Sequence, residues 1–315
     1  MTLYPLPEQQ PIFIAGPTAV GKSAVALALA EKIAGEIISV DSMQVYRGLD
    51  IGTAKPSAAE RVKIPHHFID VAELTGAVDA AKFCELAQRA VVDICARKRI
   101  PIFCGGTGLY FKAFLEGLGE APPSDVNLRA ELEASPLETL LSELQEKDLV
   151  TFDRIDQKNP RRVIRAIEVI RLTGKPFSEQ RSAWQKPTAE TPDKRFLFGL
   201  SREPGDLRRR IDFRVDEMFA QGLVNETQSL LASGLDGNQT ALQAIGYRQV
   251  VEHLRGERSL AETVELVKIR TRQYAKRQMT WFRRKMYLDW THLTPTSEPG
   301  AIVETILSKY HACSR

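Results

Sequence analysis

The chain has 315 residues, of which 43% are hydrophobic and 26% charged, and its 43 Lys and Arg nearly balance 40 Asp and Glu to give a formal net charge of +3. A chain of this length can bury the cores of one or two globular domains, and we expect two. It contains no apolar run of about eighteen residues and no basic stretch followed by an apolar core at its start, so we expect no membrane association and a cytosolic location.

The first predicted strand, Ile12 to Ala15, leads into a glycine-rich loop and then into a helical pattern. The loop fits the phosphate-binding pattern GxxxxGK[ST] with Gly16, Pro17, Thr18, Ala19, Val20, Gly21, Lys22 and Ser23. Such a loop turns backbone N–H groups toward phosphate oxygens, while Lys22 would neutralise the distal phosphate and Ser23 would bind a magnesium ion. The pattern does not tell which diphosphate or triphosphate is bound.

Further short apolar strands are predicted at Glu36 to Val40, Phe68 to Val71, Pro101 to Cys104 and Phe196 to Leu200, with a helix at Ala80 to Arg97. Strands that alternate with helices predict a parallel sheet covered on both faces. The four cysteines form no CxxC pair and have no His nearby at metal-ligand spacing, so neither a zinc site nor a disulfide framework is indicated.

Two of these strands end in residues that can carry chemistry. Asp41 follows the second strand, at the edge where open α/β sheets bind ligands, and is a candidate general base. Without the neighbouring phosphate loop, a cap for the following turn would be the simpler interpretation of this residue. Thr107, in the segment GGTGLY, can donate to a phosphate or a base, although many helix entries carry Gly and Thr for capping alone.

Residues 119–195 are helical and charged in pattern and are bracketed by turn segments, which predicts an inserted helical domain. Two basic clusters suggest a polyanion partner, although solvated helix faces are the commoner explanation for either cluster alone. The first comprises Arg154, Lys158, Arg161, Arg162, Arg165 and Arg171, and the second comprises Lys268, Arg270, Arg272, Lys276, Arg277, Arg283, Arg284 and Lys285.

Long helices are predicted at Asp206 to Ala232 and at Leu260 to Met286. Arg210 and Arg214 share a face of the first, where they could hold a pyrophosphate opposite Lys22 or make surface salt bridges. On the second, one stripe could combine phosphate contacts with aromatic stacking, with its aromatic residues partly buried and its arginines outward. The stripe consists of Arg270, Tyr274, Arg277, Trp281 and Arg284.

The segments GPTAVGKS, DSMQVYRGLDIGTAKP, HHFIDV, GGTGLY, RIDFRVDEM, AIGYRQ and TRQYAKRQMTWFR, in this order, closely resemble the bacterial tRNA dimethylallyltransferases, also called tRNA isopentenyltransferases. The resemblance covers about residues 12–290, and Val20 stands where family members carry a smaller residue. It implies a phosphate-loop NTPase-like core from residues 1–118 and 196–290, a helical tRNA-binding insertion at 119–195 and a C-terminal tail or helix at 291–315.

The resemblance also implies the reaction, in which a dimethylallyl group passes from dimethylallyl pyrophosphate to N6 of adenosine 37 in transfer RNAs that read codons beginning with U. Asp41 would take the amine proton. The phosphate loop, Mg²⁺ on Ser23, Thr107 and Arg214 would stabilise the departing pyrophosphate. The implied enzyme is a monomer that needs no nucleotide hydrolysis.

The same resemblance assigns the contacts to tRNA, whose adenine must leave its stack to react. The assigned residues are Asp41, Ser42, Met43, Gln44, Thr107, Arg129, Arg161, Arg162, Val163, Ile164, Arg165, Gln243, Ala244, Ile245, Gly246, Tyr247 and Arg248.

Two other classes of protein share parts of this pattern. A phosphate-loop kinase would begin in the same way, but such enzymes usually hold magnesium with an Asp at the end of a second apolar strand, where this chain has Gly105 and Gly106. Asp70 could still supply that carboxylate. An RNA-binding module with a vestigial loop would explain the basic helices, but not Lys22, Ser23 and Asp41 together.

Overall fold

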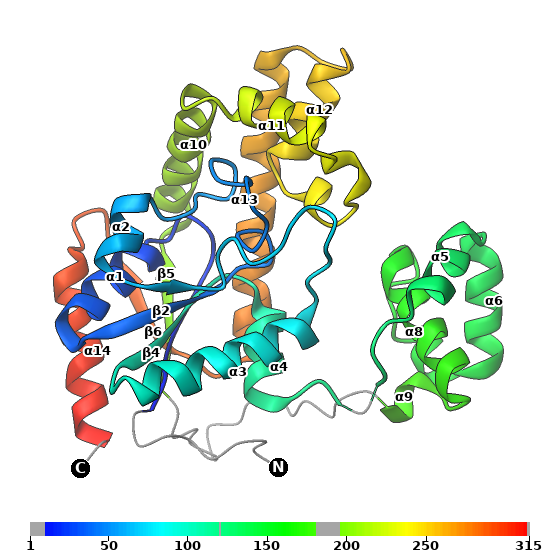
Figure 1. Ribbon diagram of the computed structural model, residues 1–315, viewed down its shortest axis with the longest axis horizontal. Helices are drawn as coiled ribbons and strands as arrows, with labels where there is room; N and C mark the ends of the chain where they lie inside the picture. Colours follow the sequence, from blue (N-terminus) through cyan, green and yellow to red (C-terminus); the bar gives the residue numbers. More distant parts are fainter. Residues whose placement is uncertain (1–9, 120, 181–195, 314–315) are drawn as a thin grey trace. The chain divides into compact units, whose positions relative to one another are not determined.

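The computed structural model describes residues 10–119, 121–180 and 196–313. The chain divides into two compact units, a sheet unit of residues 1–112 with 186–315 and an inserted unit of residues 113–185 (Figure 1). The insertion expected at 119–195 starts six residues later and ends ten residues later than this unit, and its second boundary lies outside the described residues.

The sheet unit is built on six parallel strands in the order β3-β2-β4-β1-β5-β6. Their bounds are β1 Ile12–Ala15, β2 Gly35–Val40, β3 His66–His67, β4 Ile100–Gly105, β5 Phe196–Arg202 and β6 Asp289–Leu293. Four of them are buried along nearly their whole length, as continuous apolar strands of a parallel sheet are. The predicted α/β fold with a phosphate-loop NTPase-like sheet is confirmed.

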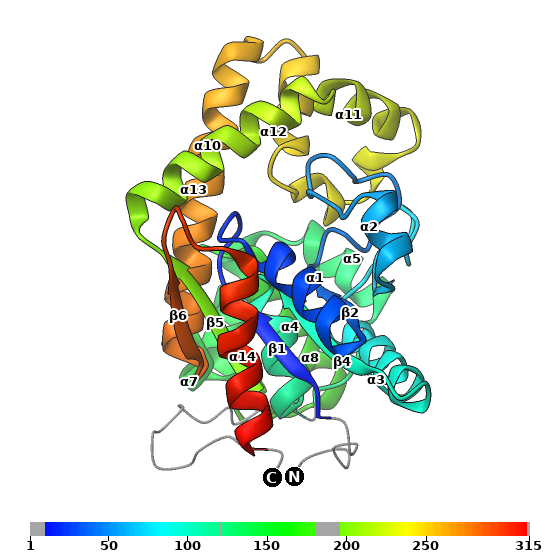
Figure 2. The same cartoon turned by 90° about the vertical axis from the view of Figure 1, so that its left-hand side faces the viewer.

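Helices cover both faces of this sheet. On one face, α1 (Lys22–Ile33) packs beside α14 (Pro299–Cys313) over Ile12, Ile14 and Ile102, and Figure 2 shows these two helices side by side in front of the strands. On the other face, α3 is Ala80–Ala96 and α4 is Gly108–Glu116. Aromatic rings fill that side, where Phe13 stacks on Phe103 with ring centroids 4.7 Å apart.

Two predictions about strands were wrong or incomplete. The strand expected at Phe68 to Val71 is absent, because pairing ends at His67 and the φ angles of Phe68 and Asp70 are 68° and 56°, which an extended strand does not allow. Of the segment expected as a C-terminal tail or helix, residues 291–293 complete β6 at the sheet edge and Pro299–Cys313 form α14. A short α2 (Ala58–Lys63) precedes β3.

A helical layer follows β5. It comprises α10 (Pro204–Ala220), α11 (Leu223–Ala232), the short turns η1 (Leu235–Gly237) and η2 (Ala241–Gln243), α12 (Tyr247–Leu254) and α13 (Leu260–Lys285). The single helix predicted for Asp206 to Ala232 is broken at Gly222, whose φ of 101° ends α10 before α11 begins. The start of α13 is fixed by a capping box between Ser259 and Glu262.

The inserted unit is all-helical in its described residues. It contains α5 (Val126–Ala134), α6 (Leu137–Lys147), α7 (Leu149–Phe152), α8 (Pro160–Thr173) and α9 (Phe177–Gln180). Its core gathers around α8, which starts with Asn159 as cap and Pro160 in its first turn and ends at Gly174 in the left-handed conformation.

Candidate active site

The phosphate loop joins β1 to α1 and has the backbone geometry that its sequence predicts. Ala19 and Gly21 have φ angles of 62° and 113°. A Cβ on Gly16 would lie 2.6 Å from the carbonyl oxygen of Leu200, so only glycine fits beside β5. Since α1 begins at Lys22, its first N–H groups lack helical acceptors and form an anion site at the carboxyl edge of the sheet.

Two arginines hold the loop from outside. Arg202 Nε donates to the carbonyl oxygen of Val20 at 2.8 Å, and Arg210 Nε donates to that of Ala19 at 2.9 Å. These bonds occupy loop carbonyls and leave the N–H groups at the start of α1 to face an anion. The structure therefore gives Arg210 a supporting role in the loop.

Lys22 lies inside the loop, where its Nζ donates to the carbonyl oxygen of Pro17 at 2.8 Å. Burial lowers the pKa of Lys22 to about 8, and the nearby charge of Arg214 acts in the same direction, whereas Cys104 and Asp41 oppose the shift. The ammonium is thus placed where a further negative charge would stabilise it.

Arg214 reaches this region from α10. Burial, and then the charge of Arg210, lower its pKa. Among the described residues Arg214 makes no ion pair, although the charge of Glu217 opposes the lowering of its pKa. The other two nearby carboxylates on α10 are bound elsewhere, Asp212 by Arg272 at 2.7 Å and Asp216 by Lys268 at 2.8 Å. For Arg210 and Arg214 we predicted either pyrophosphate binding or surface salt bridges. Arg214 makes no such salt bridge in the described residues and remains a cation that faces the phosphate loop.

Asp41 lies directly after β2, as predicted. Its Oδ1 accepts from the N–H groups of Met43 and Gln44 at 2.8 and 3.3 Å, so the carboxylate does cap the following turn. In the described part of the chain Oδ2 makes no hydrogen bond. One oxygen therefore fixes the carboxylate while the other remains available to a substrate.

Thr107 meets the Asp41 loop directly. Its Oγ1 accepts from Ser42 N at 3.2 Å, and the N–H groups of Gly106 and Thr107 both donate to the carbonyl oxygen of Val40. The hydroxyl hydrogen stays free to donate, as we expected for a phosphate contact. The structure thus joins Asp41 and Thr107 in one site beside the phosphate loop.

Glycines in the Thr107 loop admit close neighbours. A Cβ on Gly106 would lie 2.2 Å from Gln278 Nε2, and one on Gly108 would lie 2.2 Å from Trp281, both residues of α13. Sequence reasoning missed Gln278, although its spacing from Tyr274 and Trp281 puts it on the same helix face.

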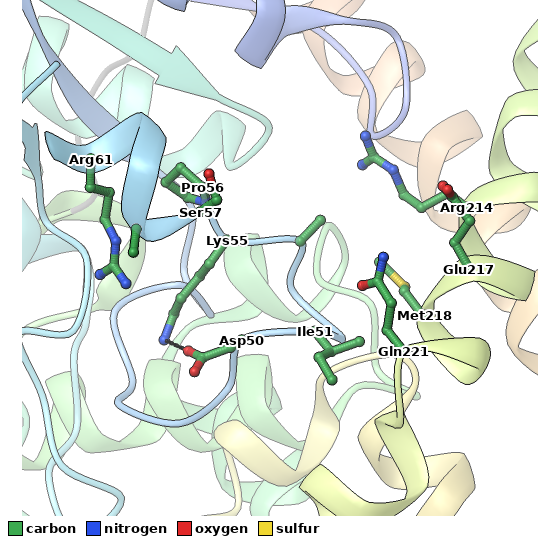
Figure 3. Close-up of a pocket in the computed structure, with 12 residues that line it drawn as sticks. Asp50, Ile51, Lys55, Pro56, Ser57, Arg61, Arg214, Glu217, Met218 and Gln221 are labelled. Atoms are coloured by element: carbon green, nitrogen blue, oxygen red, sulfur yellow. Dashed lines mark hydrogen bonds and ion pairs between the residues drawn. The ribbon is translucent and has the colours of Figure 1, made fainter. Parts of the chain in front are cut away.

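Gln44 is held by its surroundings. Its Nε2 donates to the carbonyl oxygen of Thr53 at 3.1 Å and its Oε1 accepts from Ser39 Oγ at 2.8 Å. The loop that it supports borders a pocket of about 420 Å³. Figure 3 shows Lys55, Asp50 and Arg61 on one side of this pocket. On the other side it shows Arg214, Glu217 and Met218 from α10, with Gln221 just after this helix.

Asp70, the carboxylate that a kinase would need, is neutralised. Lys55 Nζ contacts it at 2.5 Å and Arg61 Nη1 at 2.7 Å. These bonds hold the pKa of Asp70 below its usual range, in spite of its burial. The residue thus stabilises the loop before α2 and does not replace the missing magnesium ligand.

The segment 243–248 separates into exposed and structural residues. Gln243 and Arg248 are exposed, Ile245 is half-buried, and Gly246 has a φ of 102°. Ala244 and Tyr247 are buried, and Tyr247 Oη accepts from Gly52 N at 3.0 Å while donating to Glu226. The side chains of Ala244 and Tyr247 therefore pack inward, where Tyr247 holds α12 to the loop after β2, and the RNA contact predicted for this segment stays a prediction.

The inserted unit shows the same division. Val163 and Ile164 are buried in its core, so their side chains pack inward, and the RNA contact predicted for this part of α8 stays a prediction. Arg161 and Arg162, in the first turn of α8, are exposed.

Arg129 and Arg165 are also brought together, by the fully buried Glu168. Glu168 accepts from Arg165 at 2.6 Å and from Arg129 at 3.2 Å. This carboxylate fixes both guanidiniums at the surface of the inserted unit, and the sequence analysis did not single it out.

The stripe on α13 has the mixed character that we expected. Arg270, Arg277 and Arg284 are exposed, whereas Tyr274 and Trp281 are half-buried. A groove of about 500 Å³ lies along it and is lined by Gln273, Lys276, Arg277, Thr280, Trp281, Arg284 and Lys285. Basic heads around aliphatic stems and an indole ring suit a nucleic-acid backbone and its bases.

Membrane-spanning helices and side-chain metal sites are both absent from the residues that the structure describes. None of their helices combines the length and apolar character needed to cross a membrane. They contain no group of three or more His, Cys, Asp or Glu side chains able to hold a metal ion. A cation here would depend on a ligand's phosphate oxygens together with a hydroxyl such as that of Ser23, which is exposed in the first turn of α1.

The fold and site define a class, namely an α/β phosphate-loop protein in which two cations and one carboxylate converge at the carboxyl edge of the sheet. Comparison with known proteins narrows this class. Residues 44–285 match the IPP transferase family, so the chain belongs to this family, as its motifs predicted.

Individual relatives bear names of the same family. The tRNA dimethylallyltransferase of Geobacter metallireducens is 45% identical over 307 residues, which span 95% of this chain and 97% of that protein. The crystal structure of tRNA isopentenylpyrophosphate transferase from Bacillus halodurans is similar with a TM-score of 0.70 and 37% identity, covering 97% of this chain and 98% of its own. A eukaryotic dimethylallyltransferase acting on tRNA is similar with a TM-score of 0.76 and 27% identity, over 96% and 80% of the two chains.

Proposed function

We propose that the protein transfers a dimethylallyl group from dimethylallyl pyrophosphate to N6 of adenosine 37 in transfer RNAs that read codons beginning with U. The observation that carries the proposal is the pair Lys22 and Arg214, two enclosed cations that face the phosphate loop beside Asp41. Membership of the IPP transferase family supports it. Such a site suits a pyrophosphate that becomes more negative as it leaves.

The bond changes follow from this arrangement. The carbon–oxygen bond to pyrophosphate breaks, its electron pair leaves with the pyrophosphate, and the N6 lone pair forms the new bond to the allylic carbon. The N6 proton passes to Asp41, whose Oδ1 is already fixed by Met43 and Gln44. Lys22, Arg214, the loop N–H groups and the Thr107 hydroxyl hold the pyrophosphate.

Magnesium fits this proposal. Mg²⁺ usually keeps several waters and needs few protein ligands when phosphate oxygens are present, and Ser23 is exposed next to Lys22. When bound, the ion would neutralise part of the charge on the pyrophosphate. The residues of the chain perform the remaining tasks of orienting the amine, accepting its proton and holding the leaving group.

For RNA, we propose that exposed basic residues bind the anticodon stem-loop. In the inserted unit they are Arg161 and Arg162, beside the half-buried Arg129 and Arg165 that Glu168 holds. In the sheet unit they are Arg248 and the basic residues that line the groove on α13. We further propose a cytosolic location, where this RNA is found, and a monomeric enzyme, since one chain carries every group that the reaction requires.

Incubation with labelled dimethylallyl pyrophosphate, magnesium and unmodified transfer RNA tests the proposal. Fragment analysis of the RNA should place the label on adenosine 37, and a transcript with guanosine at that position should stay unlabelled. Label on another nucleoside would contradict the site of transfer, and no label on any RNA would contradict the reaction.

A further inference from the structure

One side-chain amide links the two loops that would hold the leaving group. Gln278, in the middle of α13, is 7% exposed. Its Oε1 accepts from Thr18 N at 2.9 Å, and its Nε2 donates to the carbonyl oxygen of Gly106 at 3.0 Å. Thr18 belongs to the phosphate loop after β1 and Gly106 to the loop after β4, and these strands are neighbours in the sheet.

The fit around this amide is close. Any side chain at Gly106 would place its Cβ 2.2 Å from Gln278 Nε2, and the first turn of α4 is covered in the same way by Trp281 at Gly108. A buried amide with both its oxygen and its nitrogen bonded has a fixed orientation, because breaking either bond leaves a polar group unsatisfied. Gln278 therefore sets the separation between the two loops.

The connection extends to the carboxylate. Thr107, next to Gly106, accepts from Ser42 N, and Ser42 follows Asp41. The leaving-group loop and the proton-accepting loop are thus joined through Gln278, Gly106 and Thr107. Transfer requires the amine, the allylic carbon and the pyrophosphate to lie in line, so this spacing bears directly on the rate.

We infer that Gln278 is a positioning residue for dimethylallyl transfer, which acts through Thr18 and Gly106 and touches neither substrate. The inference rests on the proposed function. Helix α13 would then have two roles. Its outer groove binds RNA, and its inner face fixes the distance between the pyrophosphate loop and the loop that joins Asp41.

Gln278→Met tests the inference, since methionine has a similar size but can form neither bond. In a single-turnover assay with both substrates saturating, the rate constant should fall about 100-fold, the loss expected from a misplacement of about 1 Å. The Kd for tRNA should stay within about twofold, because the groove is intact. Glu265→Gln, on the exposed surface of the same helix, is the matched control and should keep the wild-type rate.

A double-mutant cycle separates positioning from a general loss of stability. Gly106→Ala should slow transfer as much as Gln278→Met, because its Cβ displaces the amide. Gly106→Ala combined with Gln278→Ala leaves room for that Cβ. The double variant should therefore be no slower than the slower of its two single variants, Gly106→Ala and Gln278→Ala. Losses that multiply would overturn the inference.

Folding and baseline activity are checked alongside. Circular dichroism shows whether each variant is folded, and Gln278→Asn, whose amide can reach one loop at most, provides a second variant if the Met variant is not. A wild-type rate in a folded Gln278 variant would refute the positioning role. An inactive wild-type protein would instead refute the proposed function, so the two failures are distinguishable.

Discussion

Lys22 Nζ lies 2.8 Å from the carbonyl oxygen of Pro17, so the cation of the phosphate loop is held against the backbone of its own loop. Burial lowers its pKa from 10.5 to about 8. The unfolded chain keeps this proton to higher pH, so the Lys22 contribution makes the free protein more stable as the pH rises from about 8 to about 10.5.

Binding of dimethylallyl pyrophosphate should raise the lowered pKa of Lys22 again. The ligand favours the charged amine, so binding should take up a proton near pH 8.5 and weaken as the pH rises further. Calorimetry in two buffers of different ionisation enthalpy measures the uptake. Lys22→Met should abolish the part of the uptake due to Lys22, and an unchanged value would show that Lys22 does not face the ligand.

Arg214 and Arg210 should differ in their kinetic roles. Arg214→Ala removes a cation from the leaving group and should lower kcat about 10²–10³-fold with an unchanged melting temperature. Arg210→Ala removes the bond to Ala19 and should mainly raise the KM for dimethylallyl pyrophosphate. Arg208→Ala, exposed on the same helix, is the matched control, and equal losses for all three variants would rule out this assignment.

Glu168 should matter for RNA without touching it. Glu168→Ala leaves the partly exposed Arg129 and Arg165 without their shared partner, and the lost hydrogen bonds should destabilise the inserted unit by about 1–3 kcal/mol. The milder Glu168→Gln should raise the Kd for tRNA at least tenfold and leave binding of dimethylallyl pyrophosphate unchanged. Gel-shift and calorimetric titrations measure the two affinities, with the exposed Glu133→Gln as control. A Glu168→Gln protein with wild-type RNA affinity would contradict the role given to this network.

Two buried tyrosines should respond oppositely to loss of the hydroxyl. Tyr46 Oη has no hydrogen-bond partner among the described residues, so Tyr46→Phe should raise the free energy of unfolding by about 1 kcal/mol. Tyr247 Oη bonds Gly52 and Glu226, so Tyr247→Phe should lower it by about 1–3 kcal/mol. Urea denaturation measures both, and a destabilised Tyr46→Phe would show that its hydroxyl is satisfied in solution.

Local sequence signals predicted the phosphate loop, Asp41 and the ends of α3 and α13, because glycine conformations, caps and apolar periods are encoded over a few residues. β6 was missed because the segment 289–293 is only half-buried at the sheet edge and has no continuous apolar run. The break before α11 was missed although Gly222 marks it, since the apolar period continues across the glycine.

At the candidate site, too, the sequence alone could not identify every residue correctly. Helical spacing alone does not separate the exposed Arg161 from the buried Ile164, because residues three apart share a helix face, and only the core of the inserted unit distinguishes them. Gln278 depends on contacts between residues 172 and 260 positions apart in the chain, which no local pattern encodes. Tertiary structure was needed to distinguish Arg210 from Arg214 for the same reason.

The most direct test of the central claim is the stoichiometry of a single turnover without nucleotide. Purified protein, magnesium, dimethylallyl pyrophosphate and unmodified transfer RNA should release one pyrophosphate for each N6-(dimethylallyl)adenosine formed, with ATP neither required nor consumed. A requirement for ATP, or phosphoryl transfer in place of prenyl transfer, would contradict the account of the phosphate loop as a holder of the leaving group.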